Sequence, residues 1–153
     1  MARTIGYTDS RIDTLITEFQ HNSHIYPNVS NLTCTMTAGA TPNVMSAWVE
    51  ITDSGATTMS SLFATSDGHI SGIEVYDCNV ADKVYLVDMT YGAAKVGITS
   101  FSFSSNAIGK KLIPKLIKVR ADHIPAGETV YYRAMCETAS KTLLVSFRYH
   151  LHT

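Results

Sequence analysis

Hydrophobic and polar residues alternate along most of the chain after Val44. The alternation is clearest in the last segment, 142–152, where nearly every second residue is apolar. Successive side chains of a strand point to opposite faces, so this segment predicts an antiparallel strand with one buried and one solvated face. The apolar face would carry Leu143, Val145, Phe147, Tyr149 and Leu151, and the polar face would carry Ser146, Arg148, His150 and His152.

Seven runs of this kind follow one another, separated by turn residues such as those at 53–55 and 125–127. Almost no helical pattern lies between them, which predicts an all-β fold, an antiparallel β-sandwich. An eighth strand from residues 30–37 would complete a jelly-roll-like pair of sheets. The seven predicted strands are 44–52, 69–76, 83–89, 95–104, 113–121, 129–137 and 142–152.

The first part of the chain has a different pattern. Ser10 is a good helix N-cap, and apolar residues then recur at the spacing of one helical face. A helix this short is marginal by itself, so its apolar stripe is expected to dock on the sandwich or on a neighbouring chain. We therefore divide the chain into a helix and extended arm at 1–43 and a β-sandwich domain at 44–153. The apolar stripe consists of Ile12, Leu15, Ile16 and Phe19.

The composition predicts a surface rich in uncharged polar groups. Of 153 residues, 45% are hydrophobic and only 16% are charged, below the quarter or so of an average domain. The net charge is −1, but acidic residues dominate up to Thr90 and basic residues dominate after it. Either strands of both halves intermix in one sandwich, or the halves provide charge complementarity between subunits or with a host surface.

The three cysteines, Cys34, Cys78 and Cys136, have no spacing typical of a disulfide framework or a zinc site. We expect each to act as a small hydrophobic residue. The sequence shows no signal-peptide pattern and no apolar run long enough to cross a bilayer. The expectation is a protein made in the reducing host cytoplasm, with no membrane partner.

Histidines are the best candidates for metal ligands. His150 and His152 would lie on one strand face, yet zinc requires three or four convergent ligands, and none lies at matching local spacing. We expect these two to be surface histidines, unless they lie near an oligomer axis where symmetry multiplies the ligands. No metal and no cofactor is therefore predicted.

Signatures of catalysis are absent from the sequence. It contains no G-x-S-x-G elbow and no glycine-rich phosphate loop, and the prediction is a non-enzymatic protein. A small hydrolase remains a hypothesis, because two carboxylates can come from anywhere in a chain.

The basic run 109–120 lacks the interleaved aromatic residues of a surface that binds single-stranded nucleic acid, so no specific nucleic acid is expected. Trp48 is expected in the core, although exposed aromatics would favour sugar stacking.

Short motifs in the second half carry a resemblance to a known family. They are Tyr85-Leu-Val-Asp88 with Tyr91-Gly92, Lys118-Val-Arg-Ala121, Ile124-Pro-Ala-Gly127, Tyr132-Arg-Ala134, the small-residue turn 138–142, and Val145-Ser146. Together they resemble small jelly-roll virion structural proteins of tailed bacteriophages. Tyr131 and Tyr132 depart from that pattern, which has smaller residues there.

The resemblance implies a capsid decoration (cement) protein in the virion. Such a protein would form a homotrimer with two further copies of itself and would bind the major capsid protein or other virion proteins. The predicted helix at 12–19 would then tether it to the shell or to a neighbour. The alternative is a phage tail or baseplate module that binds a carbohydrate or receptor. The Ile124–Gly127 motif predicts a β-turn that sets the register between two long strands.

Overall fold

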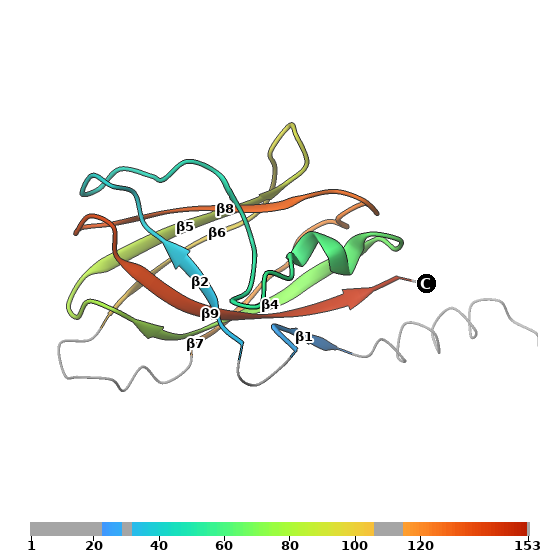
Figure 1. Cartoon of the computed structure of the whole chain (residues 1–153), viewed down its shortest axis with the longest axis horizontal. Helices are drawn as coiled ribbons and strands as arrows, with labels where there is room; N and C mark the ends of the chain where they lie inside the picture. Colours follow the sequence, from blue (N-terminus) through green and yellow to red (C-terminus); the bar gives the residue numbers. More distant parts are fainter. Residues whose placement is uncertain (1–22, 29–31, 106–114, 153) are drawn as a thin grey trace, which may run out of the picture.

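Two antiparallel sheets pack face to face in the computed structural model, which describes residues 23–28, 32–105 and 115–152 (Figure 1). The prediction of an all-β antiparallel sandwich is confirmed. Sheet A has the order β1-β9-β4-β7, with β2 also paired to β9, and sheet B has the order β3-β8-β5-β6. Their bounds are β1 His24–Tyr26, β2 Cys34–Thr37, β4 Gly68–Cys78, β7 Lys115–Lys118 and β9 Thr142–Leu151 in sheet A, and β3 Val49–Glu50, β5 Val84–Tyr91, β6 Val96–Ser104 and β8 Val130–Cys136 in sheet B.

The strand pairs are nested in sequence. The innermost pair is β5 with β6, followed outward by β4 with β7, β3 with β8, and β2 with β9, all antiparallel. We call this arrangement the rolled hairpin, because it is one long hairpin whose two arms alternate between the sheets. The additional pairs β4–β9 and β5–β8 join the folded arms into sheets.

The core lies between the sheets and follows the predicted alternation. In β9, Leu143, Val145 and Phe147 are fully buried, whereas Arg148 is exposed. Sheet B contributes every second residue of β5 and β8 in the same way. A 3₁₀ helix at Met59–Phe63 inserts its first and last side chains into this core. Apolar burial of this kind is the main stabilising term of the fold.

Part of the predicted arm belongs to the sandwich. Both β1 and β2 pair with β9, and they place Tyr26 and Met36 in the core. Among the described residues, position 44 therefore does not separate two packing units, and β2 supplies the eighth strand expected near residues 30–37. The predicted helix with Ile12, Leu15, Ile16 and Phe19 lies outside the described residues.

The turn around Pro125 connects the two sheets. The backbone N–H of Glu128 donates to the carbonyl oxygen of Pro125 at 3.3 Å, and Gly127 has a φ of 79°, which suits glycine. The strands on either side, β7 and β8, lie in different sheets. The prediction that this turn sets a strand register was wrong, because its flanking strands do not pair.

Charged residues of the two halves meet within sheet B. Nη2 of Arg133 on β8 lies 2.8 Å from the Asp88 carboxylate on β5. The acidic and basic parts of the sequence thus intermix, as the first of the two charge interpretations expected.

The three cysteines are free thiols: Cys34 and Cys136 are buried, and Cys78 is half-buried. No helix in the described ranges is long and apolar enough to cross a membrane.

Candidate metal centre and surface pocket

Four histidines gather at one end of sheet A because of the strand register. His69, the second residue of β4, pairs with His150 of β9. On the other side of β4, the backbones of Gly68 and Ile124 exchange two hydrogen bonds of 3.1 and 2.7 Å. His123 precedes Ile124 and therefore lies opposite His69. Paired residues share a sheet face, so these histidines point to the same side.

His152 joins the same face, since it follows His150 by two residues. Its backbone N–H donates to the carbonyl oxygen of Asp67 at 2.8 Å, which extends the β4–β9 contact by one residue. We call His69, His123, His150 and His152 the histidine cluster. Its members come from β4, from β9 with the residue that follows it, and from the connection between β7 and β8.

Gly68 permits the close approach of the strands that carry the cluster. A Cβ atom at this position would lie 2.2 Å from the carbonyl oxygen of His150 and 2.9 Å from the Phe63 ring. Any other residue would push β9 away from the start of β4. The absence of a side chain at Gly68 thus allows the strands to lie close enough for the histidines to contact one another.

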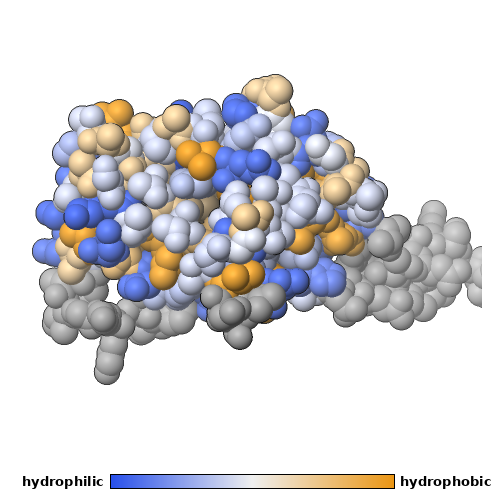
Figure 2. All heavy atoms as spheres, in the orientation of Figure 1, coloured by the Kyte–Doolittle hydropathy of each residue, from blue (hydrophilic) through white to orange (hydrophobic). Residues whose placement is uncertain are grey.

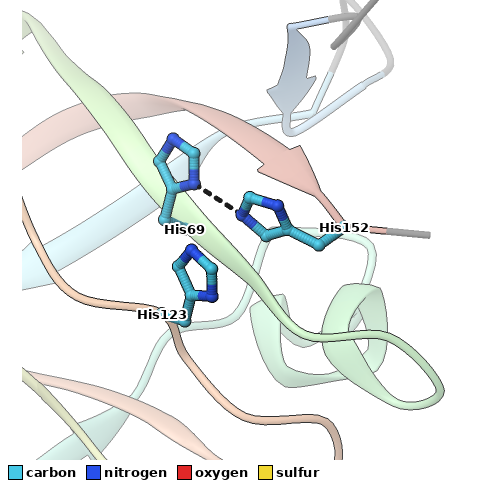
Figure 3. Close-up of side chains that lie close together, drawn as sticks. All are labelled: His69, His123 and His152. Carbon is cyan, nitrogen blue, oxygen red and sulfur yellow. Dashed lines mark hydrogen bonds between the residues drawn. The ribbon is translucent and has the colours of Figure 1, made fainter. Parts of the chain in front are cut away.

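Three rings of the cluster converge (Figure 3). Nδ1 of His69 lies 2.9 Å from Nε2 of His152, and the rings of His123 and His152 stack with centroids 4.1 Å apart. One ring nitrogen from each of His69, His123 and His152 lies within 4.8 Å of the other two. This spacing suits side chains that share one small ion.

Two further side chains flank these rings. The His150 ring stacks on His69 with centroids 5.0 Å apart, and a carboxylate oxygen of Asp67 lies 3.8 Å from Nδ1 of His123. The His123 side chain is 60% exposed, whereas His69 and His152 are half-buried. The cluster is thus built into the sheet on one side and open to solvent on the other.

The sequence identified only half of this cluster. His150 and His152 were predicted to share a strand face, and both rings lie against that of His69, with centroids 5.0 and 5.1 Å away. His69 and His123 were not recognised as their neighbours, because they are far away in sequence. The sequence contains no local signal for their positions, because the β4–β9 register and the bridge between Gly68 and Ile124 join distant residues.

A pocket of about 450 Å³ lies on sheet B. Trp48 lines it and is half-buried, so the prediction that it lies in the core was wrong. Its ring packs against the guanidinium of Arg133, whose Cζ lies 4.6 Å from the ring centroid. Asp88 accepts hydrogen bonds from Arg133 at 2.9 Å and from Ser100 at 2.7 Å. These contacts fix the positions of the polar groups along the pocket wall.

Thr90, one of the residues around this pocket, has a buried hydroxyl group without a hydrogen-bond partner among the described residues. The residue is 6% exposed, and among the described residues its Oγ1 has no hydrogen-bond partner. A buried hydroxyl without a partner loses the hydrogen bonds it would make with water.

The structure thus defines the class of this protein as an antiparallel β-sandwich with a histidine cluster at one end of sheet A. Comparisons with protein-family models, with curated proteins and with solved structures find no match to the chain.

Proposed function

We propose that this chain is a non-enzymatic structural protein of a bacteriophage virion, which decorates and stabilises the capsid as a homotrimer. The observation that carries the proposal is the rolled hairpin. The sheet order β1-β9-β4-β7, with β2 also paired to β9, facing β3-β8-β5-β6 is similar to that expected of a jelly roll, an architecture found in viral capsid proteins and also in lectins. The motifs that resemble small phage virion proteins, such as Ile124–Gly127, lie on this same framework.

The surface supports assembly through several small contacts. On the face shown in Figure 2, apolar side chains form small separate groups among polar ones. Among the described residues, exposed large apolar side chains occur on four strands at the sheet edges, where a strand of a neighbouring chain most readily pairs. Weak contacts of this kind become strong when many copies bind a repetitive shell. The edge residues are Ile25 on β1, Val49 on β3, Val96 on β6 and Leu116 on β7.

The full chain is expected to have three times its 16.7 kDa mass in solution. Charging an edge strand should weaken the trimer, because a lysine at a contact must be desolvated. We expect Val96→Lys or Leu116→Lys to shift the mass toward that of one chain, as measured by light scattering across a dilution series.

Val84→Lys is the matched control. Val84 is 45% exposed and Val96 46%, but β5, which carries Val84, lies inside its sheet. A full chain that stays monomeric at high concentration and does not co-sediment with capsid shells of the same virion would contradict the proposal.

A second candidate function is carbohydrate binding by a tail or baseplate module, which the pocket beside Trp48 favours. The aromatic ring provides a stacking surface, and Asp88 and Arg133 supply polar atoms beside it. A pocket with an apolar wall and a few fixed polar groups is typical of small-ligand sites.

If a glycan binds here, Trp48→Ala should weaken binding at least tenfold, because it removes the stacking surface. Ser100→Ala should weaken it less, by releasing one hydrogen bond that fixes Asp88. Ser102→Ala, on the same strand outside the pocket, serves as the control. A glycan array followed by titration calorimetry measures these effects. Equal binding by Trp48→Ala, or an array without any hit, would exclude this candidate.

A further inference from the structure

The histidine cluster combines donor atoms that the virion proposal does not use. His69, His123 and His152 each bring a ring nitrogen into a space only 4.8 Å across. Imidazole nitrogen suits zinc, copper, nickel and iron, whereas calcium and magnesium require oxygen ligands. We propose that these three histidines bind a divalent transition-metal ion, with zinc as the representative ion.

The spacing of the donors is close to that of a bound state. Ligand nitrogens about 2.0–2.1 Å from a tetrahedral zinc ion lie about 3.3 Å apart. Nδ1 of His69 and Nε2 of His152 are already 2.9 Å apart, so a small separation of these two atoms would admit the ion. His123 is the most exposed of the three and comes from a connection, so its ring can adjust by side-chain rotation.

Asp67 is placed to orient the third ligand. Its carboxylate lies 3.8 Å from Nδ1 of His123, and a short approach would let that nitrogen donate a hydrogen bond to it. Nε2 would then face the ion, and in Figure 3 the His123 ring points toward the other two rings. A carboxylate behind a metal-binding histidine fixes the tautomer and increases the basicity of the ligand.

Three protein ligands leave a fourth position, which opens toward solvent beside the exposed His123. Water or a group from another molecule can occupy it, as in zinc sites that have three protein ligands. The bound ion would join the start of β4, the β7–β8 connection and the residue after β9. The site would therefore cross-link three segments that are distant in sequence, and it does not depend on the virion proposal.

The test uses the untagged full chain, because an affinity tag of histidines would itself bind metal. After treatment with a chelator, titration calorimetry with Zn²⁺ is expected to show one ion per chain, with no comparable binding of Ca²⁺ or Mg²⁺. Zn²⁺ should also raise the unfolding temperature, since a ligand that binds only the folded state stabilises it. Co²⁺ in the same site should give the visible absorption of a tetrahedral complex.

His123→Ala and His152→Ala are expected to weaken Zn²⁺ binding at least tenfold. His123 is exposed, so its variant should keep the unfolding temperature of the metal-free parent. His24→Ala is the matched control, because His24 pairs with Tyr149 and therefore lies on the other face of sheet A from the cluster. Zn²⁺ binding that is absent in the parent, or equally strong in His123→Ala, would overturn the proposal.

Discussion

Phe147→Ala is expected to lower the free energy of unfolding by about 3–5 kcal/mol, the usual cost of removing a buried phenylalanine ring. Phe147 is fully buried in β9, and β9 pairs with β1, β2 and β4. Its ring lies 6.2 Å from that of Tyr26, centroid to centroid, so the substitution also removes an aromatic contact between β9 and β1. The cavity would open in the middle of the sandwich, where the strands cannot easily close over it.

Urea unfolding of the parent and the variant measures this loss. Arg148→Ala is the control from the next position of the same strand, where the side chain is exposed. It should change the free energy of unfolding by about 0.5 kcal/mol or less, as surface substitutions usually do. Similar losses of stability for the two variants would contradict the burial of the face of β9 that carries Phe147.

Stability is expected to fall steadily as the pH rises above about 9. Burial raises the pKa of the Cys34 thiol from its ordinary value to about 12, with a smaller contribution from Asp53 nearby. Burial likewise raises the pKa of Tyr26 and Tyr85. In this range the unfolded chain has released protons that the folded chain still holds, so the unfolded state is favoured as the pH increases.

Each such group can lower the free energy of unfolding by up to about 1.4 kcal/mol per pH unit between its unfolded and folded pKa. Urea unfolding at pH 7, 9, 10 and 11 measures this decline, which should be small below about pH 8, where all three groups are protonated in both states. Cys34→Ala should make the decline shallower, because it removes the group with the lowest unfolded pKa of the three. A stability that stays constant from pH 9 to 11 would contradict the assigned burial of these groups.

The strands were predictable because each long strand has one apolar and one polar face. The predicted run 142–152 corresponds to β9, Thr142–Leu151, and the run 83–89 corresponds to β5, Val84–Tyr91. The run 44–52 was predicted too long, since only Val49–Glu50 pairs there with β8. β1 was missed because three residues are too few to show a period of two, and Pro27 follows them directly.

The candidate sites were less predictable than the strands. The two-residue spacing of His150 and His152 is a local property, and it correctly predicted a shared face. The position of His69 beside them depends on the β4–β9 register, and that of His123 depends on the bridge at Gly68. Both are contacts between distant residues, on which a single sequence carries no local signal. The same limit applies to Trp48, whose contact with Arg133 places it at a pocket.

The rolled hairpin also determines when the fold can be completed during synthesis. β9 is the strand with which β1, β2 and β4 all pair, and it comes after every other described strand in the sequence. A ribosome therefore releases β1, β2 and β4 well before their common partner exists. Sheet B is in a similar position, because β8 joins β3 to β5 and also comes late. The nascent chain can form the β5–β6 hairpin early, but sheet B must wait for β8 and sheet A for β9, and the unpaired early strands are exposed to aggregation until then.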